Sequence, residues 1–172
     1  MPYFDMQLRR AEPDDAMAVA RVHVRSWQVA YRTLLPDDYL DQLRPEDRAK
    51  TYDFANLDPL KPRTVVASEE RVILGFATTM PSRDADLPEH GELCAIYVDP
   101  DRWGQGIGMA LLSAARANLF ALGYRQALLW VLAGNARAER FYRTDQWVAD
   151  GCCRTDSVWG VTVNEVRYQR GL

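Results

Sequence analysis

The chain has 172 residues, a length typical of one domain, and 48% of them are hydrophobic, as in globular proteins. Its formal net charge of −3 gives no electrostatic ground for binding nucleic acid or an anionic membrane. No apolar run reaches the roughly 18 residues of a membrane-spanning helix, and the first residues lack the basic and apolar regions of a signal peptide. Three cysteines make no disulfide framework, and two histidines without a Cys-x-x-Cys pair give no ground for a metal site. We therefore expect a reduced, cytoplasmic protein without a metal.

The N-terminal half is predicted to hold one strand, several helices and a hairpin. Pro13, followed by Asp14 and Asp15, indicates the first turn of a helix, because proline suits that turn and carboxylates favour the helix dipole. Two β-branched runs on either side of residues 69–71 indicate the hairpin. The expected elements are a strand at 7–10, a helix from 13 to 36, helices at 37–43 and 46–56, and strands at 64–68 and 72–79.

The C-terminal half alternates strand and helix patterns after a polar loop at residues 81–90. The apolar run at 93–98 is typical of a buried strand, and Gly123 is a plausible end for the helix that follows it. The expected elements are strands at 93–98, 127–132, 148–154 and 161–168, a helix at 109–122 and a short helix beginning at Asn135. The two halves together predict an α+β fold, with one mixed sheet and helices on both faces.

A glycine-rich loop joins the strand at 93–98 to the next helix. Gly104, Gly106 and Gly108 bare the backbone N–H groups where the helix begins, and such a helix end favours an anion. The glycine spacing differs from that of a dinucleotide-binding loop, and the Gly-Lys-Ser/Thr of a P-loop is missing. The loop therefore indicates a phosphorylated ligand, with a purely structural turn as the alternative.

A second motif follows the strand at 127–132, where Asn135 stands as a good N-cap before Phe141 and Tyr142. With the glycine loop at residues 103–108, this motif resembles the two motifs of the GNAT superfamily of acyl-CoA N-acyltransferases. The stretch at 26–36 resembles a W-x-x-x-Y-R subgroup of that superfamily. The resemblance covers nearly the whole chain and implies a single acetyltransferase domain, residues 1–172. It also implies a central mixed, mostly antiparallel sheet with a splayed strand pair.

Two positions depart from the family pattern. Trp103 replaces the usual arginine or glutamine, a position that acts in the family mainly through its backbone. Gln146 stands where the family usually has glycine, the residue that most readily adopts the backbone conformation at the end of a helix.

The resemblance implies a site for acetyl-CoA as co-substrate. Backbone groups of the strand before the loop would pair with the pantetheine arm, and the loop would hold the pyrophosphate. Asn135 either contacts the pantetheine arm or only caps its helix. The cofactor-binding residues so implied are Ile96, Tyr97, Val98, Trp103, Gly104, Gln105, Gly106, Ile107, Gly108, Met109 and Asn135.

The same resemblance assigns chemistry to a few side chains. Tyr142 is the candidate general acid that protonates the leaving thiolate, with aromatic packing as its alternative. Glu92 is the candidate base for the acceptor amine, and His90 is the other option. Trp27, Tyr31 and Arg32 fall in the segment that covers the acceptor site in this family.

The predicted function is transfer of acetyl from acetyl-CoA to a primary amine, by direct attack in a ternary complex. The alternatives are a non-catalytic acyl-CoA sensor, a nucleotide-binding protein, and an acyltransferase with another acyl donor or a hydroxyl acceptor. The acceptor is a small molecule or peptide, not nucleic acid or membrane, and a homodimer is possible by family analogy alone.

Overall fold

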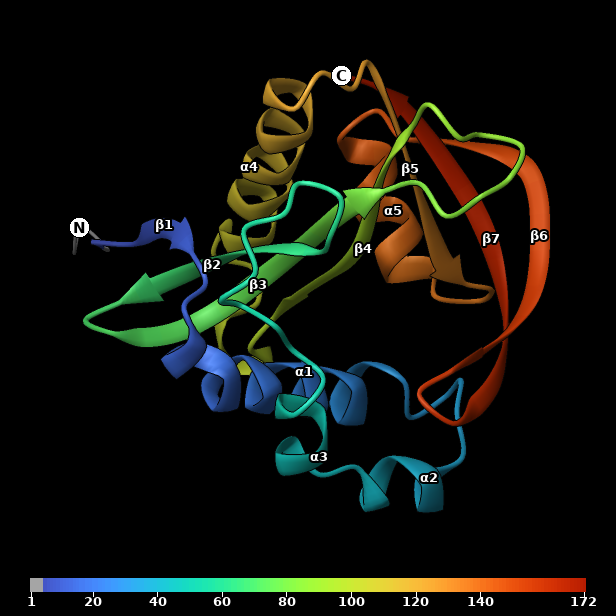
Figure 1. Ribbon diagram of the computed structural model, residues 1–172. Helices are drawn as coiled ribbons and strands as arrows, with labels where there is room; N and C mark the ends of the chain where they lie inside the picture. Colours follow the sequence, from blue (N-terminus) through green and yellow to red (C-terminus); the bar gives the residue numbers. More distant parts are fainter. Residues whose placement is uncertain (1–4) are drawn as a thin grey trace.

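A twisted seven-stranded sheet forms the middle layer of the protein (Figure 1). The computed structural model describes residues 5–172. The strands are β1 (Gln7–Arg10), β2 (Arg63–Glu69), β3 (Val72–Pro81), β4 (Gly91–Val98), β5 (Gln126–Leu132), β6 (Val148–Val158) and β7 (Val161–Gly171). Their order is β1-β2-β3-β4-β5-β7-β6, and only β4 and β5 run parallel. The mixed, mostly antiparallel sheet predicted from the sequence is therefore confirmed.

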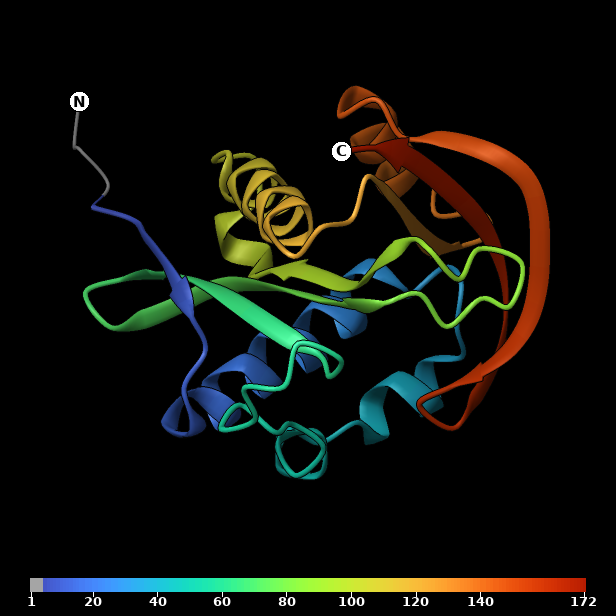
Figure 2. The ribbon, with the colours of Figure 1, turned by 45° about the horizontal axis from the view of Figure 1, so that its top comes forward.

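Helices cover both faces of this sheet (Figure 2). They are α1 (Ala16–Ala30), α2 (Asp37–Gln42), α3 (Pro45–Ala49), α4 (Ile107–Ala121) and α5 (Ala136–Thr144), with 3-10 turns at Pro13–Asp15 and Pro100–Arg102. The first three helices lie on one face, and α4 and α5 lie on the other. Within residues 5–172, none of the helices combines the length and the apolar character needed to cross a membrane.

Each face of the sheet has its own apolar core. On the α4 face, Leu111, Leu112 and Leu119 are buried against strand residues such as Leu129. On the α1 face, the buried residues fall into two clusters, one around Trp27 and one around Phe76. The sheet therefore separates two packed layers, and its central strands can present different groups to each layer.

Two predicted elements have different bounds in the structure. The helix expected at 46–56 ends at Ala49, because the Thr51 side chain donates to the Arg48 carbonyl at 2.7 Å and takes over the helix end. The last two strands are longer than expected and meet at a tight turn of Trp159 and Gly160, with φ of 52° and 80°. Polar residues at 155–157 continue the edge strand, where one face is open to solvent.

The end of α5 carries a residue in an unfavourable conformation. Gln146 has φ of 68°, and hydrogen bonds from Gln146 N to Arg143 O and from Trp147 N to Tyr142 O complete a Schellman motif around it. The residue therefore adopts the left-handed conformation that the usual glycine would take without steric cost.

We expect Gln146→Gly to raise the free energy of unfolding by about 1 kcal/mol, because it removes this left-handed strain. Urea denaturation measures the change. Gln42→Gly, at the exposed end of α2, is the matched control and should instead destabilise the protein. A loss of stability in Gln146→Gly would show that the glutamine side chain stabilises this turn.

Candidate active site

The parallel strands β4 and β5 separate part-way along the sheet. Their pairing covers only Gly91–Leu93 with Ala127–Leu129, yet the strands continue to Val98 and Leu132. The predicted splayed pair is therefore present. The gap exposes strand edges in the middle of the sheet, where a ligand can pair with backbone groups.

A β-bulge in β4 decides which side chains face each layer. Leu93 lies opposite Thr79, but Ala95 lies opposite Thr78, so Cys94 is an extra residue on β4. Because strand side chains alternate, the extra residue places Glu92 on the same face as Ala95. Without the bulge, Glu92 would point toward α4 instead.

On the α4 face, the glycine loop opens directly onto a helix N-terminus. Gly104 and Gly106 have φ of 76° and 81°, and α4 starts at Ile107. The first helical hydrogen bond runs from Ala110 N to Gly106 O, so the N–H groups of residues 107–109 precede it. These groups and the helix dipole make this loop suitable for an anion such as a phosphate.

The Trp103 side chain makes a hydrogen bond and a cation–π contact at the edge of this loop. Its indole Nε1 donates to the Val98 carbonyl at 2.9 Å, and the Ser26 hydroxyl donates to the same oxygen at 3.1 Å. The Arg137 guanidinium lies 3.5 Å from the centre of the Trp103 ring. The Val98 carbonyl is therefore already bonded, and a cation from α5 stands beside the loop.

The backbone of Ile96 faces the gap between β4 and β5. The Asp99 N–H donates to Leu74 O of β3 at 2.8 Å. Because backbone groups alternate in an antiparallel ladder, those of Ile96 and the N–H of Val98 point the other way, toward β5. The backbone groups of Ile96 and the N–H of Val98 are therefore available to the predicted pantetheine arm. The backbone of Tyr97 is not, because it faces Phe76 of β3.

Tyr142 lies on α5 in the same apolar cluster as Ile96 and Val98. Its ring packs in an edge arrangement against Phe141, with centroids 5.4 Å apart. Burial, together with the nearby Tyr97 hydroxyl, raises the pKa of Tyr142, so this phenol keeps its proton at neutral pH. The structure thus places a proton donor beside the splayed strands.

Asn135 and Gly108 organise the start of the two helices on this face. The Asn135 side chain accepts from Ala138 N at 3.2 Å, which makes it the N-cap of α5. Gly108 faces the Phe141 ring where α4 meets α5, and a Cβ there would lie 3.4 Å from that ring, an ordinary contact distance. Asn135 therefore fixes the start of α5, and Gly108 lies at the contact between α4 and α5.

On the α1 face, a cavity of about 780 Å³ lies against the bulged part of β4. Glu92 lines this cavity and is 1% exposed. Its Oε2 accepts from Arg83 Nε at 2.8 Å, whereas Oε1 has no hydrogen-bond partner within residues 5–172. A buried carboxylate oxygen without a donor is costly unless a ligand supplies one.

Cys94 also lines the cavity, with its Sγ 3.6 Å from Glu92 Oε2. Burial and the Glu92 carboxylate raise the pKa of the Cys94 thiol well above its usual value. The thiol therefore stays protonated and is a poor nucleophile at neutral pH. Within the described part of the chain, no group of three His, Cys, Asp or Glu residues is placed to hold a metal ion.

His23 is the centre of an aromatic wall of the cavity. Its ring lies 4.7 Å from the Tyr97 ring and 5.0 Å from the Trp159 ring, and its Nδ1 accepts from Arg48 Nε at 3.2 Å. Burial and the Arg48 charge hold the pKa of His23 well below its usual range. The wall is therefore built around a neutral imidazole.

A second buried carboxylate lines the cavity from β7. Glu165 lies opposite Leu132, where β5 has left β4, and its side chain is 8% exposed. It accepts from Arg154 Nε at 3.0 Å. Burial raises the pKa of Tyr31, as does the Tyr97 hydroxyl, and the Glu165 charge contributes in the same direction. This carboxylate therefore stands near the tyrosines beside the strand gap.

The predicted acceptor and base residues occupy different surroundings. Trp27 and Tyr31 are buried, and the Tyr31 and Tyr97 hydroxyls are 3.3 Å apart. Arg32 is exposed, pairs with Asp41 at 2.8 Å and does not line the cavity. His90 is also outside the cavity, and its Nε2 lies 2.9 Å from Gln169 Oε1.

Comparisons with known proteins place this arrangement in a family. The model of the acetyltransferase (GNAT) family matches residues 24–145. The chain belongs to this family. It is 34% identical to the uncharacterized N-acetyltransferase YuaI of Bacillus subtilis over 128 residues, 74% of this chain and 72% of that protein. It is also 31% identical to a mycothiol acetyltransferase of Saccharopolyspora erythraea, over 75% of this chain but only 39% of that protein.

Solved GNAT structures share the fold of this acetyltransferase. The PaiA N-acetyltransferase of Thermoplasma acidophilum, solved in complex with coenzyme A, aligns with a TM-score of 0.71 at 16% identity. The alignment covers 98% of this chain and 99% of that one. The GNAT family and fold predicted from the two sequence motifs are thus confirmed.

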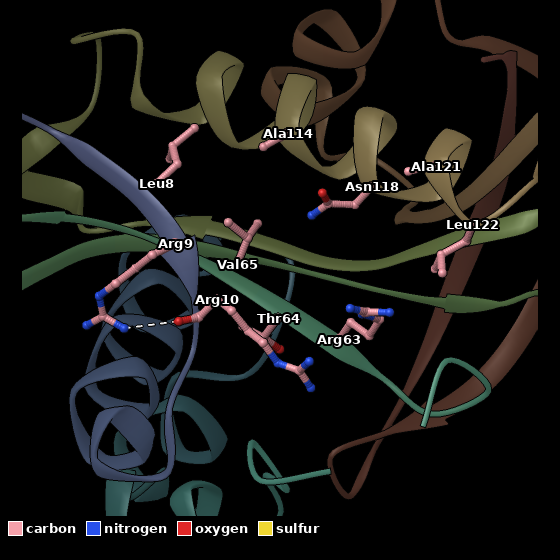
Figure 3. A pocket seen from close by; sticks show the side chains of 10 residues that line it. All are labelled: Leu8, Arg9, Arg10, Arg63, Thr64, Val65, Ala114, Asn118, Ala121 and Leu122. Atoms are coloured by element: carbon pink, nitrogen blue, oxygen red, sulfur yellow. Dashed lines mark hydrogen bonds between the residues drawn. The ribbon is translucent and has the colours of Figure 1, made fainter. Parts of the chain in front are cut away.

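The acetyltransferase has another hollow on the opposite side of β2, between this strand, β1 and α4 (Figure 3). It measures about 410 Å³, and its lining mixes apolar residues such as Val65 and Ala114 with polar and basic ones such as Asn118 and Arg63. Arg9, at its edge, is already paired with Asp15 at 2.7 Å. The hollow contains neither the glycine loop nor Glu92, so it is separate from the candidate site.

Because His23 is buried and neutral, we expect the stability of the protein to depend on pH. The unfolded chain binds a proton at His23 below about pH 6.5, but the folded protein does not, so stability falls as the pH is lowered through this range. Between pH 7.5 and 5.5 we expect His23 to account for a loss of about 1.4 kcal/mol.

Urea denaturation at the two pH values measures this loss in the wild type and in His23→Gln, which should lack it. His90→Gln, the variant of the other histidine in the chain, should keep it. An equal pH dependence in wild type and His23→Gln would contradict a neutral His23.

Proposed function

We propose that this GNAT protein transfers acetyl from acetyl-CoA to a primary amine by direct attack in a ternary complex. The observation that carries the proposal is the arrangement around β4. The anion-binding loop and Tyr142 lie on one face, and the cavity with Glu92 lies on the other. The gap between β4 and β5 joins the two faces, so two substrates can meet there from opposite sides.

The proposed coenzyme site fits the residues present. The N–H groups of residues 107–109 and the left-handed Gly104 and Gly106 would hold the pyrophosphate. The backbone of Ile96 and the N–H of Val98 would pair with the pantetheine amides. When bound, the thioester supplies an activated acetyl group. The coenzyme A in the PaiA structure supports this assignment by analogy of fold.

Two side chains account for the proton transfers. Glu92 removes a proton from the acceptor ammonium, through water in the cavity, because Glu92 lies four positions before Ile96 on β4, a rise of about 13 Å. The neutral amine then attacks the thioester carbonyl, whose developing charge is stabilised by a strand N–H. Tyr142 donates its proton to the departing thiolate, and the proton that the attacking nitrogen loses as the amide forms returns to the phenol. Cys94 forms no acyl intermediate, because its thiol stays protonated.

The acceptor site is the cavity on the α1 face, and residues 1–172 act as one domain. A homodimer is compatible with this scheme but takes no part in it. The mycothiol acetyltransferases among the relatives extend well beyond the matched region, so they leave the acceptor open.

Thiol release from acetyl-CoA in the presence of an amine panel tests the proposal, with acetylated products identified by mass spectrometry. We expect thiol release that depends on both the protein and an amine, with one acetyl group added per thiol released. Acetyl-CoA binding without transfer to any amine would favour the non-catalytic sensor instead.

A further inference from the structure

In the acceptor cavity, two acidic side chains are more deeply buried than the basic side chains paired with them. Glu92 and Glu165 are 1% and 8% exposed as side chains, whereas their partners Arg83 and Arg154 are 57% and 29% exposed. Both acids therefore lie deeper than the guanidinium groups paired with them. An ammonium group reaches the acids, and an anionic group reaches the bases nearer the opening.

Arg48 is the basic group best prepared to bind a further anion. It lies on α3 at the cavity wall, half-buried, and its Nε donates to His23 Nδ1 at 3.2 Å. Its guanidinium carbon lies 4.7 Å from the centre of the Trp159 ring and 5.7 Å from that of Tyr52. These contacts hold the guanidinium in place but do not neutralise it.

No carboxylate within residues 5–172 forms an ion pair with Arg48. The other arginines of the cavity are paired with acids, Arg83 with Glu92 and Arg154 with Glu165. An oriented guanidinium that lacks an acid is suited to bind a carboxylate through charge-assisted hydrogen bonds.

The lining as a whole argues against a polycation as the acceptor. Its basic residues are Arg48, Lys61, Arg83 and Arg154, and its acidic residues are Asp53, Glu92, Asp156 and Glu165. Four formal positive charges thus face four negative ones, and Asp156 is itself 3.4 Å from Arg154. A polyamine would meet no net negative charge, whereas a molecule with one amine and one carboxylate matches both kinds of group.

We propose that the acceptor is a primary amine that also carries a carboxylate, and that Arg48 recognises this carboxylate while the amine lies on the side of Glu92. The inference rests on the proposed acetyl transfer. It adds the chemical class of the acceptor and a residue that determines specificity. The aromatic wall around His23 packs against the part of the molecule that connects the two charged ends.

Matched amine pairs test this inference. They are lysine with cadaverine, phenylalanine with 2-phenylethylamine, and γ-aminobutyrate with butylamine, which span different separations of the charged groups. We expect kcat/KM for the carboxylated member to be at least about ten-fold higher in one pair or more, as for a charge-assisted contact. Arg48→Met should reduce that ratio by about the same factor, and the control Arg44→Met, an exposed arginine at the start of α3, should not.

A second measurement does not depend on acetyl transfer. Phenylacetate, which has the carboxylate but no amine, is titrated against the intrinsic fluorescence of Trp159 and the other tryptophans. We expect saturable binding in the wild type and in Arg44→Met, binding weakened about ten-fold or more in Arg48→Met, and partial retention in Arg48→Lys. Thermal melts confirm that each variant is folded.

Equal or higher kcat/KM for the uncarboxylated amines in every pair would overturn the inference, as would a ratio that Arg48→Met leaves unchanged. If no amine is acetylated, the fluorescence titration decides. Binding that depends on Arg48 would then uphold carboxylate recognition while refuting the transferase, and its absence would refute the role of Arg48.

Discussion

Tyr142→Phe is expected to lower kcat for acetyl transfer by about 100-fold, because the departing thiolate loses its proton donor. The dissociation constant for acetyl-CoA should change by no more than about two-fold, since phenylalanine keeps the packing of the ring. Steady-state kinetics and calorimetric titration measure the two quantities. Tyr124→Phe is the matched control, because Tyr124 is a partly buried tyrosine in the same apolar cluster.

The raised pKa of Tyr142 adds a second expectation. Because this phenol keeps its proton at neutral pH and above, its ionisation should not lower kcat anywhere below about pH 10. A wild-type rate in Tyr142→Phe would mean that the thiolate leaves without a protein donor. Weaker acetyl-CoA binding with an unchanged kcat would instead assign Tyr142 to binding.

Glu92→Gln is expected to lower kcat/KM for the amine by about 100-fold, because the substituted amide cannot accept the proton of the ammonium. Glutamine has nearly the same shape and still offers an oxygen to Arg83, so the fold should be kept. The loss should shrink for an acceptor of low pKa, which is already neutral at the assay pH.

Glu89→Gln, an exposed acid in the loop before β4, is the control for this substitution and should behave as the wild type. Activity of Glu92→Gln equal to the wild type would exclude Glu92 as the base. Glu165, the other buried acid in the cavity, would then be the group to replace next.

The two sequence motifs were sufficient to predict the family, the splayed strands and the loop at the start of α4. Their predictive power has a physical source, because glycines at the start of a helix and an N-cap before an aromatic pair are local features. Local features of this kind can be recognised without knowledge of the tertiary structure. Site roles for individual residues, including Tyr142 and Glu92, remain predictions.

The cavity could not be read from the sequence in the same way. The bulge at Cys94 reverses the alternation that would place Glu92 toward α4, and nothing in the run at 91–98 marks it. Arg48 and His23 come from different helices, and only the tertiary fold brings them together at 3.2 Å. These positions were missed because their signal is spatial rather than sequential.

The sequence of β7 contains a pattern that indicates the buried acid Glu165, which was not among the predicted site residues. Residues 163, 165 and 167 alternate onto one face, so the pattern buries Val163 together with Glu165 and Arg167. Charged residues are rarely buried unless they are paired or functional. The burial of Arg167 is compensated by ion pairs with Asp84, Asp86 and Asp150, at 2.9, 2.8 and 2.6 Å. Glu165 is also paired, with Arg154 at 3.0 Å, so the alternation of β7 marks it as a buried acid without distinguishing a functional role.

Calorimetric titration of the purified protein with acetyl-CoA, with ATP and NADH as controls, tests whether the site binds this co-substrate. We expect saturable binding of one acetyl-CoA per chain and no comparable binding of either control. Failure of the folded protein to bind acetyl-CoA would refute the proposed acetyl transfer and leave the glycine loop as a structural turn or a site for another ligand.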